Sequence, residues 1–215
     1  MPRKAPLSTV LTAAQQAALT PDAVLESLKE GNRRFVNNDI TARDHNAQVR
    51  KAASGQFPKA MVLSCVDSRV PVEDVFDKGI GDIFVGRVAG NFVNVDLLGS
   101  MEFACKVAGA KLILVLGHEY CGAVKAAIDN VKLGNMTPML AKIRPIVTRS
   151  AKTFRGRKVS ANPAFVDYVA KNNVLHNVKL ITRHSPILKE MVKAGELKIV
   201  GGYYDLDTAV VEFFD

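Results

Sequence analysis

Residues 59–71, KAMVLSCVDSRVP, carry polar side chains directly after a run of apolar residues. Residues 111–124, KLILVLGHEYCGAV, repeat this arrangement further along the chain. Short apolar runs of this kind are typical of parallel strands that are buried on both faces. Open α/β sheets bind their ligands in crevices outside the carboxyl ends of such strands. The two segments therefore predict an α/β fold with a binding site at one end of its sheet.

Two cysteines and one histidine follow these strands: Cys65, His118 and Cys121. Two thiolates and one imidazole are a usual ligand set of a catalytic zinc, which keeps a fourth position open. A structural zinc would need a fourth Cys or His. The remaining cysteine, Cys105, falls inside a predicted helix, where a small buried thiol is expected. The odd number of cysteines also favours free or metal-bound thiols over disulfides.

A carboxylate and a guanidinium accompany the first of these ligands. Alternation along an extended segment sends Cys65, Asp67 and Arg69 to the same side. Asp67 has two plausible uses at a zinc site. It can accept a hydrogen bond from zinc-bound hydroxide while Arg69 holds it in place, or it can bind zinc itself and close the site. Without a metal, the same pattern would be a turn-capping Asp paired with a surface Arg.

Composition and charge restrict the class of protein. The chain has 215 residues, 48% of them hydrophobic and 23% charged, which fits one globular domain over 21–215 preceded by an arm at 1–20. Its apolar runs are too short to span a bilayer, and its N-terminus has no apolar leader core, so a cytoplasmic location is expected, or a periplasmic one if a leader was removed. The net charge of +8 comes from scattered basic residues, the densest group lying at 144–158. We expect no nucleic-acid partner and no membrane partner.

Strand-like and helix-like segments alternate along the chain. Right-handed crossovers then give a doubly wound, mostly parallel four-stranded sheet with helices on both faces and an extra edge strand. Predicted helices start at the Thr20–Pro21 and Ser185–Pro186 capping signals. The least regular stretch is expected at 149–161. Strands are predicted at 59–64, 83–88, 111–117, 198–204 and 209–213, and helices at 94–108, 122–130 and 162–176.

Together, these motifs resemble the β-class carbonic anhydrases, in that family's order and over nearly the whole chain. The resemblance rests on GQFPKAMVLSCVDSRVP (55–71), GDIFVGRVAGN (81–91), SMEFACKVAGAKLILVLGHEYCGAV (100–124) and GGYYDLDTAVVEF (201–213). It implies one zinc per subunit, carbon dioxide and bicarbonate as substrates, and a homodimer or homotetramer whose N-terminal helices wrap the partner.

The resemblance also implies roles for single residues. Cys65, His118 and Cys121 would be the zinc ligands, and Asp67 with Arg69 the catalytic dyad. Three further residues would bind the substrate: Gln56, usually contributed by the neighbouring subunit, Phe84 in the apolar pocket wall, and Gly122 through its backbone N–H.

One branch of the family carries a glutamine at the position of Gln56. This chain departs from the pattern of that branch at two positions of the pocket. Phe103 stands where that branch often has tyrosine and Ala89 where it often has valine, so a wider pocket is expected. In another branch a tryptophan at the position of Val62 helps hold an inhibitory bicarbonate. Because this chain has Gln56 and no such tryptophan, we predict that the active, water-bound state dominates near neutral pH.

The implied reaction is attack of zinc hydroxide on carbon dioxide, after which a proton must leave. Three rival functions stay open at this stage. The same chemistry could act on carbon disulfide or carbonyl sulfide. The fold could also serve a non-catalytic zinc-binding regulatory protein, although the Asp67–Arg69 pair argues against that. A zinc-stabilised nucleic-acid binder is motivated by the basic charge alone.

Overall fold

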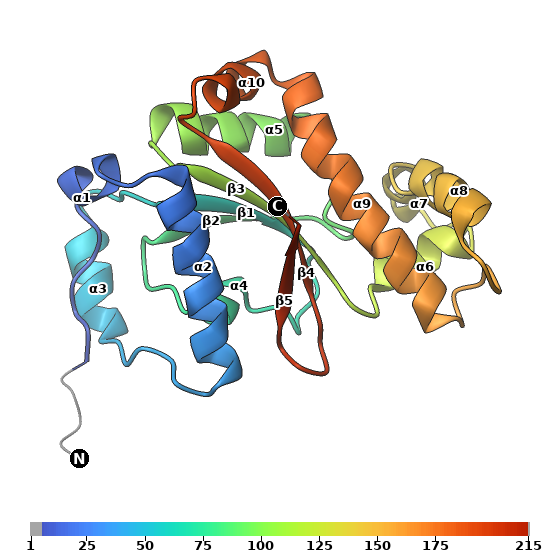
Figure 1. Ribbon diagram of the computed structural model, residues 1–215, viewed down its shortest axis with the longest axis horizontal. Helices are drawn as coiled ribbons and strands as arrows, with labels where there is room; N and C mark the ends of the chain where they lie inside the picture. The colour runs from blue at the N-terminus through green and yellow to red at the C-terminus, as the bar shows by residue number, and fades with distance from the viewer. Residues whose placement is uncertain (1–5, 215) are drawn as a thin grey trace.

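The computed structural model describes residues 6–214, so the first five residues of the predicted arm lie outside the described part. The predicted doubly wound α/β fold is confirmed (Figure 1). The strands are β1 (Ala60–Ser64), β2 (Ile83–Arg87), β3 (Leu112–His118), β4 (Lys198–Tyr204) and β5 (Val211–Phe214). The helices are α1 (Ala13–Ala17), α2 (Pro21–Val36), α3 (His45–Ala52), α4 (Val72–Val75), α5 (Val95–Glu102), the π-helix η1 (Phe103–Val107), α6 (Gly122–Ile128), α7 (Met136–Leu140), α8 (Arg144–Thr153), α9 (Pro163–His184) and α10 (Pro186–Lys193).

The sheet has the strand order β2-β1-β3-β4-β5. The first four strands are parallel and β5 pairs antiparallel with β4, as the extra edge strand of the prediction. All residues of β1 and β3 are buried, whereas β2 is only half-buried. This difference follows from position, because β1 and β3 have a strand on each side and β2 forms an edge.

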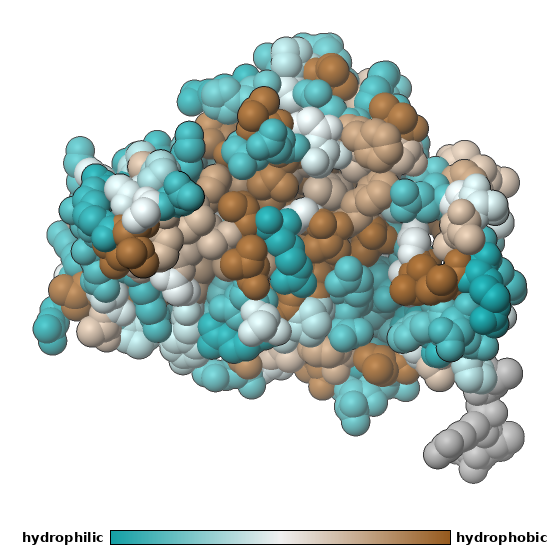
Figure 2. Space-filling model, turned by 180° about the vertical axis from the view of Figure 1, so that it is seen from behind, coloured by the Kyte–Doolittle hydropathy of each residue, from teal (hydrophilic) through white to brown (hydrophobic). Residues whose placement is uncertain are grey.

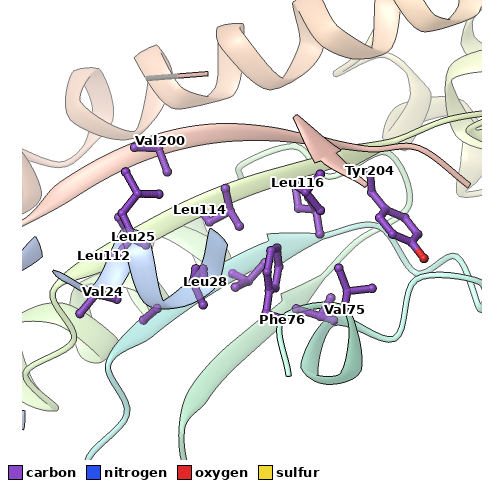
Figure 3. Packing of buried hydrophobic residues seen from close by; sticks show 14 of the residues in the cluster. Val24, Leu25, Leu28, Val75, Phe76, Leu112, Leu114, Leu116, Val200 and Tyr204 are labelled. Atoms are coloured by element: carbon purple, nitrogen blue, oxygen red, sulfur yellow. The ribbon is translucent and has the colours of Figure 1, made fainter. Parts of the chain in front are cut away.

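Alternate residues of the strands pack on opposite faces of the sheet. On one face, Leu112, Leu114 and Leu116 pack with residues of α2 and α4, as Figure 3 shows. On the other face, Ile113 and Val115 pack with α5, η1, α9 and α10. The sheet is therefore the middle of three layers.

Several helices differ from their predicted extents. The predicted 94–108 helix divides into α5 and the π-helix η1. Helix α9 continues to His184, beyond its predicted end at 176, and α8 occupies part of the stretch expected to be irregular. Helices α1, α3, α4 and α7 were not predicted. No helix within residues 6–214 is both long and apolar enough to cross a membrane.

Candidate metal centre

The ends of β1 and β3 bring the three predicted zinc ligands together. Cys65 directly follows β1, His118 ends β3, and Cys121 precedes the first residue of α6. The ligand atoms of these three residues all lie within 4.8 Å of one another, and each residue is at most 4% exposed. They come together because β1 and β3 are parallel neighbours, so both strands end at the same side of the sheet.

The ring of His118 is oriented for metal binding. Its Nδ1 lies 2.8 Å from the backbone oxygen of Glu119. Because a carbonyl only accepts, Nδ1 carries the proton, and Nε2 of the neutral ring is left as an acceptor. That Nε2 atom is buried and has no hydrogen-bond partner. A buried acceptor without a partner is costly, and a metal ion bound at Nε2 would remove that cost.

The two ligand sulfurs are linked by a hydrogen bond that shifts the pKa values of both thiols. A hydrogen bond from Cys121 is the main cause that lowers the pKa of Cys65, against the opposing effect of burial. The same bond and burial raise the pKa of Cys121. The backbone N–H of Gly90 also donates to the Cys65 sulfur, at 3.3 Å. Both hydrogen bonds favour the thiolate of Cys65, the form in which cysteine binds metals.

Asp67 and Arg69 form the predicted pair at the open side of this centre. Arg69 donates through Nε to Oδ1 at 2.9 Å and through Nη2 to Oδ2 at 2.8 Å. These charge-assisted bonds lower the pKa of Asp67 to about 2, so its carboxylate is ionised at neutral pH. Oδ2 lies 3.8 Å from His118 Nε2, which places this oxygen beside the metal-binding atoms.

The structure adds two residues to which the sequence analysis gave no role. Arg87 donates to the backbone oxygens of Cys65, at 3.0 Å, and Val70, at 2.7 Å, and so fixes the loop that carries Asp67. Gly90 has a φ of +85°, and a Cβ there would lie 2.3 Å from Ile143 Cδ1. The sequence of residues 85–91, VGRVAGN, contains a signal for each role. Arg87 is a positive charge at the end of a predicted strand, and Gly90 is a glycine in the turn that follows.

The three predicted substrate-binding residues do not gather around this centre within one chain. Gly122 adjoins Cys121, is exposed, and has open space where a Cβ would lie. Gln56 is exposed and precedes β1, whereas Cys65 follows it. Phe84 pairs with Met61, four residues before Cys65 and hence about 13 Å upstream at about 3.3 Å per residue. Phe84 instead lines a separate cavity of about 480 Å³ with Phe103.

All three cysteines are free, as predicted. Cys105 lies in η1, away from the three ligands, and is buried. Burial raises the pKa of its thiol to about 12, so this residue is an inert part of the core.

The comparisons with known proteins agree with this geometry. Residues 60–211 match the family model described as carbonic anhydrase. Carbonic anhydrase 2 of Mycobacterium tuberculosis is 38% identical over 192 residues, which cover 87% of this chain and 89% of that protein. The crystal structure of the β-carbonic anhydrase CafA of Aspergillus fumigatus has a TM-score of 0.70 at 28% identity and covers 90% of each chain.

A third comparison concerns a relative of known assembly. One of two tetrameric β-carbonic anhydrases from Sordaria macrospora has a TM-score of 0.70 to this structure, with 89% of this chain and 95% of that chain covered. At 21% identity, this similarity shows the fold alone.

Proposed function

Because the chain belongs to the β-class carbonic anhydrases and catalyses the reversible hydration of carbon dioxide to bicarbonate, we propose that Asp67 and Arg69 are its catalytic dyad. The zinc centre of this reaction is formed by Cys65, His118 and Cys121. The observation that carries the assignment of this metal site is the buried Nε2 of His118. It has no hydrogen-bond partner, and the ligand atoms of His118 and the two cysteines lie within 4.8 Å of one another. Zinc bound there would supply a Lewis acid that makes a water molecule acidic enough to act as a nucleophile near neutral pH.

Asp67 would orient a water molecule held at this centre and favour its deprotonation. An ionised carboxylate accepts hydrogen bonds but cannot donate them, so Oδ2 selects an O–H group that points toward it. Arg69 holds the carboxylate by two parallel bonds and keeps it ionised, which supports this role. The same two bonds from Arg69 would also keep the carboxylate from turning toward a metal ion bound by Cys65, His118 and Cys121. We therefore expect the open form of the site to prevail near neutral pH.

Carbon dioxide needs an apolar approach and a donor for its developing negative charge. We propose that the backbone N–H of Gly122 is this donor, since the open space at its Cα lets a small molecule come close. Gln56 and Phe84 lie too far along β1 and β2 to contact this position within one chain. We therefore propose that a second copy of the chain supplies them.

The surface around β2 supports a homodimer. Figure 2 shows apolar side chains in the middle of the face opposite to that of Figure 1, where the β2 edge and α5 reach the surface. Val95 is 80% and Val107 73% exposed, and Phe103 is half-exposed. An edge strand flanked by exposed apolar groups favours pairing with another chain. We propose a homodimer formed through β2, and a homotetramer if two dimers associate.

The carboxylate role is tested with Asp67→Asn. We expect one zinc per chain in both proteins, and a carbon dioxide hydration rate that falls about 10- to 100-fold in the variant, because an amide cannot reproduce the ionised acceptor. The measurements are metal analysis and stopped-flow hydration. Cys121→Ala serves as the comparison, since it should lose zinc and activity together. Full activity in Asp67→Asn would refute the assigned role.

The same assay with carbon disulfide and carbonyl sulfide tests the rival substrates, which share the linear shape of carbon dioxide. We expect carbon dioxide to be the preferred substrate. For the location, we propose the cytoplasm, which the three free cysteines support. Fractionation of cells would test this.

A further inference from the structure

Helices α8 and α9 enclose a groove that the zinc chemistry does not use. It has a volume of about 550 Å³, within the range of small-molecule sites. Its α9 side runs from Tyr168 to Arg183, about 22 Å at a rise of about 1.5 Å per residue. We call this space the α8–α9 groove. It is lined by Ile146, Arg149, Ser150, Thr153, Tyr168, Asn172, Leu175, His176, Lys179, Leu180 and Arg183.

One end of the groove is strongly cationic. Arg149, Lys179 and Arg183 line it, and no carboxylate does. Among residues 6–214, none of these three cations takes part in an ion pair. The neighbouring His176 lies 3.1 Å from Arg149 Nη2 through its Nδ1. Because a guanidinium only donates, Nδ1 accepts and this imidazole is neutral, so it adds no charge to the three cations.

The rest of the groove combines neutral polar groups with apolar surface. The Thr153 and Tyr168 hydroxyls lie 3.0 Å apart, and Asn172 donates to the Ser150 hydroxyl at 2.9 Å. Leu175 is 42% exposed at the groove. From Asn172 to Lys179, helix α9 advances about 10 Å. A ligand that fills the groove therefore needs an anionic group at one end and a partly apolar body with polar groups at the other.

Two features favour a small phosphorylated ligand over other anions. Arg149 and Arg183 carry planar guanidinium groups, which bind phosphate oxygens in pairs, and a phosphate monoester has a charge of about −1.5 to −2 near neutral pH. A symmetric contact between two copies over this groove would instead place like charges opposite each other. Nucleic acid is disfavoured, because the cations gather at one end and do not follow a phosphate backbone.

We propose that the α8–α9 groove binds a phosphorylated small molecule of about nucleotide size, with its phosphate between Arg149 and Arg183. The groove lies between α8 and α9, whereas the zinc ligands lie at the ends of β1 and β3. Binding there leaves the metal centre free, so the ligand and bicarbonate occupy the protein together.

Calorimetric titration of the zinc-loaded, full-length protein with adenosine 5′-monophosphate tests the proposal. We expect saturable binding that saturating bicarbonate does not displace. Arg149→Gln and Arg183→Gln should each weaken it about tenfold or more, the loss expected when a charge-assisted hydrogen bond is removed. Lys152→Gln is the matched control, because it removes a cation of α8 that does not line the groove, and binding should change by less than about twofold.

Titrations with neutral adenosine and with inorganic phosphate test separately how the body and the anionic group of the ligand contribute to binding. Adenosine should bind weakly because it lacks the anion, and inorganic phosphate should bind more weakly than the monophosphate because it lacks the body. Unchanged circular dichroism and carbon dioxide hydration would show that the variants are folded. If one of the two glutamine variants does not fold, Arg149→Lys or Arg183→Lys is used in its place. Three results would overturn the proposal: no saturable binding in the millimolar range, equal weakening by Lys152→Gln, or displacement by bicarbonate.

Discussion

At the scale of single residues, two buried asparagines of α9 hold the turn that supports Cys65. Asn173 donates through Nδ2 to the Gly90 oxygen at 2.8 Å, and Asn177 accepts from the Val93 N–H at 2.8 Å. Gly90 in turn donates its N–H to the Cys65 sulfur. Asn173 and Asn177 are at most 1% exposed, so these bonds have no competition from water. The position of the Gly90 N–H therefore depends on a helix remote in sequence.

Asn173→Ala should consequently weaken zinc binding. Loss of the side chain leaves the Gly90 oxygen without its partner and frees the turn to move, and outer-shell changes of this kind typically cost about 10- to 100-fold in metal affinity. Competition with a metal chelator measures the effect, and the thiolate absorption of a cobalt-substituted protein reports on the Cys65 bond. Asn172→Ala is the matched control, since the Asn172 side chain donates to Ser150 and not to the turn at 90–93. An equal loss of affinity in both variants would contradict the assigned role of Asn173.

At the scale of secondary structure, the strands and the ligand positions could be predicted because both depend on local pattern. Apolar runs gave β1 and β3, and Cys65 and His118 stand at their ends. The end of α9 could not be found in this way. Asn173 and Asn177 interrupt its apolar stripe. Their side chains can be buried because they form hydrogen bonds with the backbone of the distant turn at 90–93.

The π-helix and the short helices also lacked a local sequence signal from which they could be predicted. In η1 the chain inserts an extra residue into the turn after α5, and no glycine or proline marks that change. Helix α3 has an Asp44 cap but little apolar surface, since Gln48 is its only buried residue. Its position is set by contacts with the arm, which the sequence does not reveal.

The segment between α2 and α3 is held by one buried carboxylate. Asp77 accepts hydrogen bonds from Arg34, Arg43 and the Thr41 hydroxyl, the last at 2.8 Å. Asp77→Asn should lower the free energy of unfolding by about 3 kcal/mol, because it leaves the buried Arg43 without a counter-charge. Urea unfolding at fixed protein concentration measures this. Asp74→Asn is the control, since Asp74 is exposed and its substitution should change the stability by less than about 0.5 kcal/mol.

The contribution of Asp77 should also depend on pH. Burial opposes its ionisation, but the bonds from Arg34, Arg43 and Thr41 outweigh burial and lower its pKa from the usual 3.8 to about 2. The folded protein therefore holds this proton less tightly than the unfolded chain. The stabilisation is complete above about pH 4 and is lost as the pH falls toward about 2. The stability difference between the native protein and Asp77→Asn should shrink over that interval, and a constant difference would contradict the assignment.

At the scale of the whole molecule, the sheet separates Gln56, for which we propose a substrate-binding role, from the zinc ligand Cys65. Gln56 and Cys65 lie beyond opposite ends of β1, so one chain cannot place both around the same metal ion. The strand predicted at 59–64 already separates the two residues in the sequence analysis, and the resemblance places Gln56 at the neighbouring subunit's site. The extended path of β1 between its neighbours β2 and β3 determines this separation. If Gln56 binds the substrate as proposed, the complete site needs a second copy of the chain.

Co-expression of two inactive or weakened chains tests this requirement directly. Cys65→Ala lacks the zinc site but keeps Gln56, and Gln56→Ala keeps the zinc site but lacks the side chain that its partner needs. In the mixed dimer, isolated through two different affinity tags, the remaining zinc site would receive Gln56 from the other chain if the proposal holds. We expect its hydration rate per zinc to return to that of the native protein, while the Gln56→Ala homodimer stays below it. If Gln56 instead serves the site of its own chain, the mixed dimer will be as slow per zinc as the Gln56→Ala homodimer.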